Sequence, residues 1–392
     1  MLKEPRTSRK TKVAILSVTL AQGGAERFAS TLLQNIDLSL IKPTLVLFRK
    51  IIDYPLPTDI PVILLNKTNK WKTYSAARRL AKWIDQEKPD IILCNIVSTG
   101  LFMGIVRLFS NHQPNKWIVR VGSPPEYTDR FLIWILHRLF LQKVDLFIAN
   151  SNALALNFIK IYPFAKGRVS VIENAICIET QASETNACNA QLPDQTIPVV
   201  LFVGRLNSVK CPDVFIAAFE ILLQQTDAQL WICGAGPLRS KMETQIRNLG
   251  IQNRVHFLGF RNDVHQIMKI AKALVLTSKL EGANNAIIEA QSLGLPVVST
   301  NCPVGPAEII DNEKSGFLVE IGATRQIAEA LHILITDTSL RKKYSEYALK
   351  NAHRKYSITP IMAKWHSLLT SPQRTQVTGH PETENSFSKK LS

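Results

Sequence analysis

Short apolar runs alternate with amphipathic stretches along most of the chain. The runs begin at residue 12 and are typical of buried strands, while between them apolar residues recur at the spacing of one helix face. This alternation predicts parallel sheets covered by helices on both faces. In the first half, strands are expected at 13–18, 44–48, 62–65, 91–94, 117–121, 146–149 and 169–172, and helices at 27–36, 74–86 and 151–159.

The alternation stops at residues 177–196 and then begins again. This segment is rich in Ser, Thr, Asn and Gln and has no periodicity, which is typical of a linker. Beyond it, strands are expected at 199–203, 229–233, 255–258, 273–277, 296–299 and 316–319, and helices at 214–224, 238–249, 263–270, 285–293, 324–334 and 340–349.

The pattern predicts an α/β protein of two Rossmann-like, doubly wound domains. A chain of 392 residues has room for two cores, expected at 1–176 and 197–356 with the linker 177–196 between them. A final helix at 357–370 is expected to pack back on the first domain, and the polar tail 371–392 to be disordered. Because open α/β sheets bind ligands beyond the carboxyl ends of their strands, we expect the site in a cleft between the domains.

The charge of the chain narrows the classes of partner. The net charge is +16, and residues 1–180 carry 25 Lys and Arg against 13 Asp and Glu. Such an excess suits phosphorylated ligands or an anionic membrane face, or is simply a basic surface. We expect no nucleic-acid partner, because no helix is dense in Lys and Arg and no basic strand is interleaved with aromatic residues.

The cysteines and the apolar runs indicate in which compartment the protein is expected. The six cysteines show no CxxC pair and no metal-ligand spacing, which is typical of reduced thiols in the cytoplasm. The N-terminus lacks the apolar segment of a signal peptide. The run 131–141 is too short to span a bilayer. Flanked by Arg130, Arg138 and Lys143, it is either a core helix or a peripheral contact with an anionic membrane face.

Two carboxylates bracket a loop in the segment 278–300. After the strand that ends at 277, Glu281 and Glu289 enclose seven residues with one Gly and two Asn. Asn284 or Asn285 is a natural N-cap, so the amides of residues 285–287 are expected to point out of the helix start. Carboxylates accept hydrogen bonds from hydroxyls such as those of a sugar and a ribose.

Two cations lie in another loop between a strand and a helix. Gly204 follows the strand 199–203, and Arg205 and Lys210 precede the next helix. An Arg fork and a Lys point charge in one loop can converge on a diphosphate. Solvated loop cations are the ordinary alternative.

Glycines mark two further strand-to-helix turns. The segment WICGAGPLRS, with Gly234 and Gly236, lacks the third glycine of a dinucleotide fingerprint. Near the N-terminus the loop 22–26 contains Gly23 and Gly24, which allow a ligand to approach the backbone.

Together these segments resemble glycosyltransferases of family 4, retaining enzymes with the GT-B fold. The resemblance covers about residues 12–350. It is carried by five motifs: the E-x7-E pair, G-R-x(4)-K at 204–210, G-x-G-P-L at 234–238, V-x-F-L-G at 255–259 and G-G-A-E at 23–26. It departs at 283–284, where the family usually has Phe-Pro, and at Cys211, where Gly is common. The segment 302–309 is similar to transferases of bacterial surface glycans that use UDP-hexoses or UDP-N-acetylhexosamines.

The resemblance implies a role for each matching residue. Arg205 and Lys210 would stabilise the departing diphosphate, Glu281 and neighbouring amides would hold the transferred sugar, Glu289 would hold the ribose hydroxyls, and residues 260–262 would flank the base. No metal or other cofactor is implied, because the cations and helix N-termini neutralise the diphosphate. The expected catalytic residues are Arg205, Lys210 and Glu281; the expected substrate-binding residues are Gly23, Gly24, Gly204, Gly234, Gly236, Arg261, Gly282, Ala283, Asn284, Asn285, Ala286 and Glu289.

One feature of the family is missing. Many members carry a His after a strand of the first domain, whereas the strand 117–121 leads here into Gly-Ser-Pro-Pro-Glu. Arg120 or Glu126 is a candidate for that part of the site, and a plain surface role is the alternative for both.

The function expected is therefore transfer of a hexose or N-acetylhexosamine from a nucleotide sugar, with UDP favoured, to a glycan or lipid-linked acceptor. Other functions remain open: a nucleotide-sugar epimerase or phosphorylase of the same fold, an NAD-dependent oxidoreductase, which the incomplete fingerprint at Gly234 disfavours, and a non-catalytic binding module.

Overall fold

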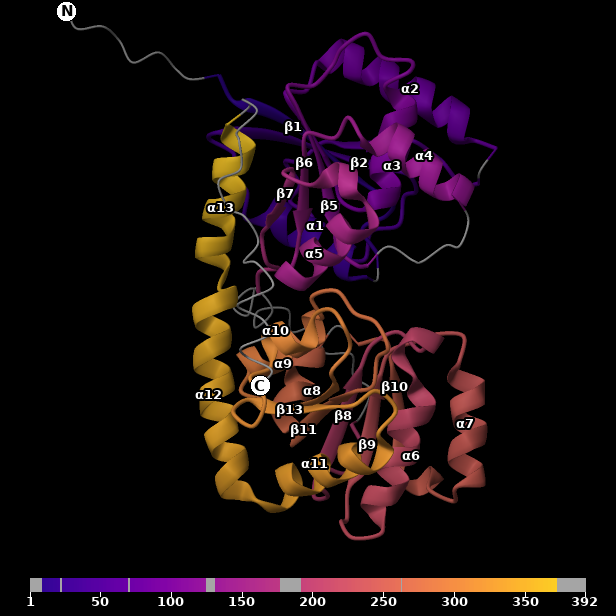
Figure 1. The fold of residues 1–392 in the computed structure, drawn as a ribbon, viewed down its shortest axis with the longest axis vertical. Helices are drawn as coiled ribbons and strands as arrows, with labels where there is room; N and C mark the ends of the chain where they lie inside the picture. The colour runs from indigo at the N-terminus through magenta and orange to yellow at the C-terminus, as the bar shows by residue number, and fades with distance from the viewer. Residues whose placement is uncertain are drawn as a thin grey trace, which may run out of the picture. The chain divides into compact units, whose positions relative to one another are not determined.

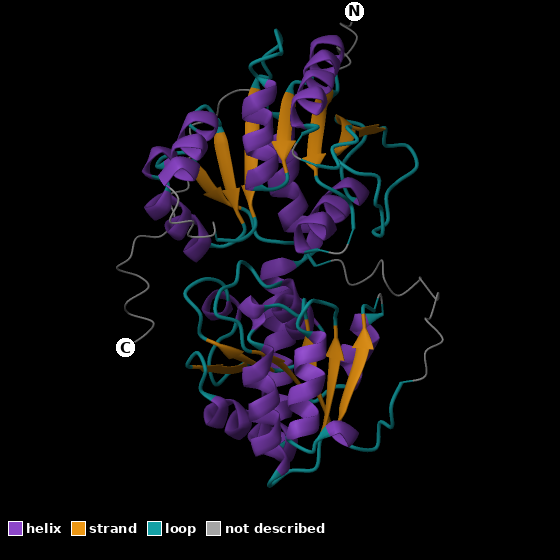
Figure 2. Ribbon diagram, turned by 90° about the vertical axis from the view of Figure 1, so that its right-hand side faces the viewer, coloured by secondary structure: helices purple, strands orange, loops and turns teal. Residues whose placement is uncertain are grey.

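The computed structural model describes residues 9–21, 23–69, 71–124, 131–176, 192–261 and 263–371. The chain divides into two compact units, one made of residues up to Ala175 together with those from Ile358, the other of Ile176–Ser357. Each contains a parallel sheet with helices on both faces (Figures 1 and 2). The expected α/β class with two Rossmann-like domains is confirmed. Residues 177–191, most of the expected linker, and 372–392, nearly all of the expected tail, lie outside the described ranges.

The first unit is built on seven parallel strands in the order β3-β2-β1-β4-β5-β6-β7. The central strands are buried along their length, which explains why they read as continuous apolar runs. The elements are β1 (Thr11–Ser17), α1 (Gly24–Gln34), β2 (Ile41–Leu47), β3 (Val62–Leu64), α2 (Thr73–Glu87), β4 (Ile91–Cys94), α3 (Val97–Val106), β5 (Lys116–Val121), α4 (Phe131–Leu141), β6 (Leu146–Ala149), α5 (Asn152–Ile161) and β7 (Val169–Val171).

The second unit is built on six parallel strands in the order β10-β9-β8-β11-β12-β13. Its core is one continuous apolar cluster around these strands. The elements are β8 (Val199–Val203), α6 (Pro212–Leu223), β9 (Gln229–Cys233), α7 (Arg239–Asn248), β10 (Val255–Gly259), α8 (Val264–Ile270), β11 (Ala273–Leu276), α9 (Asn285–Ser292), β12 (Val297–Thr300), α10 (Pro306–Ile309), β13 (Gly316–Val319), α11 (Thr324–Thr336) and α12 (Thr338–Tyr356).

The last helix, α13 (Ile358–Thr370), belongs to the first unit although it follows the second in sequence. Its Trp365 is buried against Phe28 of α1, with ring centroids 5.1 Å apart. His366 accepts a hydrogen bond from the backbone N–H of Asp37 at 3.1 Å. The first unit therefore needs chain from both ends of the protein.

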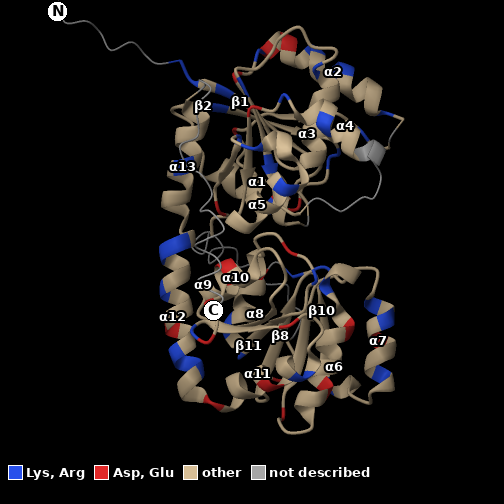
Figure 3. Ribbon diagram, viewed as in Figure 1, with Lys and Arg blue, Asp and Glu red and all other residues tan. Residues whose placement is uncertain are grey.

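Several helices differ from the expectation. α10 was not expected, and α12 extends to Tyr356 instead of ending at residue 349. α3 was not expected, because its sequence VSTGLFMGIV is apolar on nearly every face and so lacks helical periodicity; it is buried between β5, α2 and α4. α1 begins at Gly24 instead of residue 27, with Gly23 as its N-cap. In the second unit, α12 carries Lys and Arg along much of its length (Figure 3).

Candidate active site

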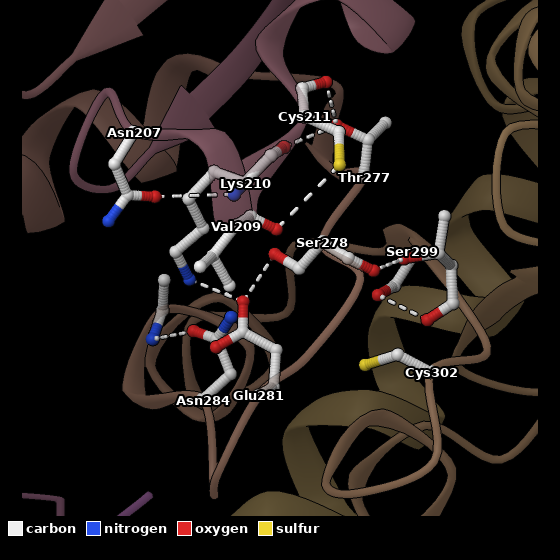
Figure 4. Close-up of polar contacts among 12 residues, drawn as sticks. Asn207, Val209, Lys210, Cys211, Thr277, Ser278, Glu281, Asn284, Ser299 and Cys302 are labelled. Carbon is white, nitrogen blue, oxygen red and sulfur yellow. Dashed lines mark hydrogen bonds and ion pairs between the residues drawn. The ribbon is translucent and has the colours of Figure 1, made fainter. Parts of the chain in front are cut away.

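The carboxyl edge of the second sheet gathers most of the expected site residues. β8, β9 and β11 each end in a loop at this edge, and Lys210, Gly234 and Glu281 lie in those three loops. Parallel strands present their carboxyl ends at one edge, so residues more than seventy positions apart in sequence become neighbours (Figure 4).

Lys210 and Glu281 form an ion pair at the centre of this edge. The Lys210 ammonium donates to Glu281 Oε1, and the Ser278 hydroxyl donates to the same oxygen (Figure 4). The two charged side chains are only 16% and 10% exposed. A pair this shielded from water interacts more strongly than a surface salt bridge. The sequence predicted both residues, but not their contact or the part played by Ser278.

Backbone contacts fix the two loops that carry this pair. The N–H of Lys279 donates to Val209 O at 2.9 Å. The Thr277 hydroxyl lies 2.8 Å from Lys210 O and 3.0 Å from Cys211 O. Cys211 adopts the left-handed conformation (φ +44°), which explains why glycine is common at this position in the family that the sequence resembles.

Asn284 caps α9 beside the ion pair. Its Oδ1 accepts from the N–H of Ala286 at 3.0 Å, and its backbone carbonyl accepts from that of Ile287 at 3.1 Å. The expectation that the amides of 285–287 all point toward a ligand is therefore wrong for these two, because the cap and the first turn already use them. Asn284 Nδ2, in contrast, is a buried donor with no partner among the residues described.

Glu289 is buried one turn inside α9 and meets a residue that the sequence did not single out. Its Oε2 lies 3.3 Å from His265 Nε2 on α8. No motif marks His265, and only the packing of α8 against α9 brings the two together.

The expected cation Arg205 stands apart from this cluster. Its side chain is exposed and makes no polar contact with any described residue, whereas Lys210 is held by Glu281. Arg205 and Lys210 both lie in the loop after β8, but only Lys210 belongs to the cluster around Glu281.

Gly234 and Gly236 allow the loop after β9 to pack against the loop after β8. A Cβ on Gly234 would lie 1.9 Å from Gly204 O, and one on Gly236 would lie 2.3 Å from Leu206 O. These glycines are required by contact between two backbones, independently of any ligand.

Arg261 follows β10 and is buried. It donates to Asp263 through Nε, at 2.7 Å from Oδ1, and through Nη2. Phe260 beside it is exposed, and Asn262 lies outside the described residues.

The loop after β12 supports the Glu281 loop from behind. Gly305 has φ +102°, and a Cβ there would lie 2.0 Å from Gly282 O. Cys302 in the same loop is buried; burial, together with the Glu281 carboxylate, raises the pKa of its thiol to about 11. Ala283 and Asn285 are half-buried in the Glu281 loop and at the start of α9.

In the first unit, the expected Gly23 and Gly24 lie at the start of α1. The Glu26 carboxylate folds back toward Gly23, where a Cβ would lie 2.3 Å from Oε2. Arg120, at the end of β5, is fully buried over the Phe28 ring and donates to Asn174 Oδ1 at 2.7 Å. Burial lowers its pKa to about 10, and Glu26 opposes that shift. Glu126 and Gln22 lie outside the described residues.

The described residues contain neither a cluster suited to a metal ion nor a helix suited to span a membrane. They contain no group of three or more His, Cys, Asp or Glu that could hold a metal ion. Likewise, none of the helices in the described part of the chain is long and apolar enough to cross a membrane. The four described cysteines are free and buried: Cys94, Cys211, Cys233 and Cys302. Cys177 and Cys188 lie outside the described residues.

Known proteins resemble both halves of the chain. The model "Glycosyltransferase Family 4" matches residues 22–180, and the model "Glycosyl transferases group 1" matches residues 184–351. A Campylobacter jejuni enzyme named N-acetylgalactosamine-N,N'-diacetylbacillosaminyl-diphospho-undecaprenol 4-alpha-N-acetylgalactosaminyltransferase is 25% identical, over 87% of this chain and 94% of its own length. A second transferase of that organism, which adds N-acetylgalactosamine to a longer undecaprenyl-linked glycan, is 24% identical over 91% and 98%.

Solved structures share the fold. Anabaena HepE, solved with UDP and glucose, superimposes with a TM-score of 0.76 at 21% identity, over 92% of this chain and all of that one. Each half of the chain matches one glycosyltransferase family model, and the relatives that match over most of their length are glycosyltransferases. The two-domain fold and the residues gathered at the second sheet agree with these matches. The chain belongs to the glycosyltransferases of family 4, which have the GT-B fold.

Proposed function

We propose that the protein is a retaining, metal-independent glycosyltransferase that moves a hexose or N-acetylhexosamine from a UDP-sugar to a glycan or lipid-linked acceptor. The observation that carries the proposal is the Lys210–Glu281–Ser278 cluster beside the capped start of α9. It provides a shielded cation for a diphosphate next to a carboxylate for sugar hydroxyls.

In this proposal each group at the edge has a separate task. Lys210 and Arg205 stabilise the charge that develops on the diphosphate as it leaves the sugar. Glu281 and the unpartnered Nδ2 of Asn284 hold the transferred sugar. Glu289, oriented by His265, accepts hydrogen bonds from the ribose hydroxyls. Retention of configuration and independence of metal come from the family resemblance.

The relatives support the proposed substrates. HepE was solved with UDP and glucose, and the two Campylobacter enzymes are named as transferring N-acetylgalactosamine to glycans on undecaprenyl diphosphate. We therefore propose a UDP-activated hexose or N-acetylhexosamine as donor and a polyprenyl-diphosphate glycan as the first acceptor to test.

A donor panel tests this function. The protein is incubated with UDP-, GDP- and ADP-sugars, with and without a lipid-linked acceptor, and nucleoside diphosphate release is measured in the presence of EDTA. We expect acceptor-dependent release of UDP and a product whose anomeric configuration, determined by NMR, matches the donor. Binding without release would indicate a binding module, and isomerised nucleotide sugar would indicate an epimerase. Loss of activity with EDTA would refute metal independence.

We also propose that the first unit attaches the protein to the inner face of the cytoplasmic membrane. On α4, Leu136 and Leu139 are 41% and 55% exposed, and Leu108 after α3 is 70% exposed. In sequence, Arg138 lies between these two leucines of α4, and Lys143 follows them. Exposed aliphatic side chains beside cations are the composition of a surface that binds anionic membranes.

Vesicle binding tests the attachment. The protein should co-sediment with anionic vesicles at low salt and less at high salt. Leu136→Gln with Leu139→Gln should weaken binding, whereas Leu249→Gln, which changes a leucine of similar exposure in the second unit, should not. Co-sedimentation that is absent, or insensitive to both salt and the α4 substitutions, would contradict the attachment.

A further inference from the structure

The first unit contains a basic cavity at the amino edge of its sheet. The cavity has a volume of about 400 Å³. It opens at the starts of β5 and β6 and before β7, the edge opposite to the one where Gly23 and Gly122 lie. Among the described lining residues, four cationic side chains stand against a single carboxylate: Arg107, Lys116, Lys143 and Arg168 against Asp145.

Three of the cations are held in place by the fold. Lys116 is buried, and its ammonium donates to Ser371 O at 2.6 Å and Leu368 O at 3.4 Å. Arg168 donates through Nη1 to Gln142 O at 2.7 Å and Val144 O at 2.6 Å. Arg107 lies over the Trp117 ring, 5.2 Å from its centroid. A cation set this constrained is already ordered before any ligand binds.

The described residues that line the cavity carry more cationic side chains than carboxylates. Asp145 is the one carboxylate among the described lining residues, and it also accepts a hydrogen bond from the backbone N–H of Trp117 at 2.8 Å. Burial lowers the pKa of both Lys116 and Arg168, with Asp145 opposing each shift. An anion in the cavity would offset the cost of burying these cations.

We propose that this cavity binds a phosphate group of a phosphorylated ligand. Lys116 donates to two carbonyl oxygens and Arg168 to three, which leaves N–H groups on both side chains for a ligand. A phosphate offers several acceptor oxygens and up to two negative charges to such a set. Lys143 is exposed at the rim and makes no polar contact with a described residue, so it is free to close on the ligand.

The phosphate has two possible sources, a phospholipid headgroup and a soluble phosphorylated compound. Exposed apolar residues next to the cavity are relevant to whether the ligand is a lipid. Leu108 and Phe109, which follow Arg107 directly, are exposed, as is Leu139 shortly before Lys143. Apolar side chains beside a phosphate-binding cavity would reach acyl chains if the ligand were a lipid.

The test uses the full chain with UDP at saturating concentration, so that the proposed donor site is occupied. Inorganic pyrophosphate is titrated at constant ionic strength and its dissociation constant is taken from the rise in melting temperature. Reversal of one charge at the rim, Lys143→Glu, should weaken pyrophosphate binding about tenfold. Lys82→Glu, an equal change of an exposed lysine on α2, should leave it unaltered. Arg107→Gln provides a second lining variant.

A vesicle arm distinguishes the two sources. If the phosphate belongs to a lipid, Lys143→Glu should also reduce binding to phosphatidylglycerol vesicles relative to Lys82→Glu. If only pyrophosphate binding falls, the ligand is soluble. Pyrophosphate binding that is the same in the Lys143→Glu, Arg107→Gln and Lys82→Glu proteins would overturn the proposal. Sugar transfer is not a readout, so this outcome leaves the proposed function untouched.

Discussion

At the scale of single residues, the Lys210–Glu281 pair has two consequences that can be separated. Lys210 neutralises a carboxylate that is only 10% exposed, and it is also the proposed cation for the leaving diphosphate. Arg205 has the second task alone, because its exposed side chain contacts no described polar group. The two cations should therefore differ in their effect on stability while agreeing in their effect on catalysis.

Alanine substitutions at both cations test this difference. Arg205→Ala and Lys210→Ala should each lower kcat and kcat/KM together, by about 100-fold or more, as expected for a lost charge-stabilising donor. Lys210→Ala should also cost about 1–3 kcal/mol of unfolding free energy, because it leaves a shielded carboxylate unpaired. Arg205→Ala should change stability by less than about 0.5 kcal/mol. Adding Glu281→Gln to Lys210→Ala should restore part of the lost unfolding free energy, because the unpaired charge is removed. Near-normal turnover in folded variants would refute the site.

His265 gives a second prediction at this scale. Glu289→Gln should raise the donor KM about tenfold with little change in kcat, because the ribose hydroxyls it is proposed to hold do not react. His265→Asn should also raise the donor KM. Its effect should be smaller in a protein that already carries Glu289→Gln. His353→Asn alters a histidine that contacts the other end of α9, at Ser292 O, and should leave KM unaltered. Independent, additive effects of His265 and Glu289 would show that the histidine does not act through the carboxylate.

At the scale of elements, backbone contact between loops shapes the edge of the second sheet. The loops after β8 and β9 touch through Gly204 and Gly234, and those after β11 and β12 touch through Gly282 and Gly305. The side chains of the proposed site keep their places only if these loops stay in contact.

A pair of glycine substitutions tests the point. Gly234→Ala would place Cβ 1.9 Å from Gly204 O, so the two loops must separate, and we expect a loss of about 3 kcal/mol or more together with weaker donor binding. Gly250→Ala, also at positive φ but in open space, should cost only about 1 kcal/mol and leave donor binding intact. Melting curves and UDP titrations measure both effects. Equal losses would mean that backbone conformation alone explains Gly234.

Local signals along the chain predicted part of this arrangement. The Asn284 cap and the strand-to-helix loops follow from residue type and periodicity, because neighbouring residues determine them. The contacts of Lys210 with Glu281 and of Glu289 with His265 depend on the packing of elements far apart in sequence, which periodicity does not encode. α3 was missed for a related reason, since a helix buried on several sides has no polar face to reveal its period.

At the scale of the whole molecule, the two units present different chemistry at the carboxyl edges of their sheets. The second unit has exposed and shielded charges in its loops. The first has a buried polar layer: Asn95 donates to Ala25 O at 2.8 Å, and Arg120 donates to Asn174. Asn95 Oδ1 and Arg120 Nη1 in that layer have no hydrogen-bond partner among the described residues. We propose that the first unit selects the acceptor and the second the donor.

An exchange of units between relatives tests this division, and α13 determines where the exchange must be cut. Because Trp365 packs on Phe28 and Lys116 donates to Ser371 O, residues 358–371 have to move together with residues 1–175. A chimera that takes both segments from a relative with another acceptor should adopt that acceptor and keep its nucleotide preference. One that takes 1–175 alone should melt at a lower temperature, because Trp365 would face a foreign surface. A nucleotide preference that follows the first unit, in a chimera with a normal melting transition, would refute the division.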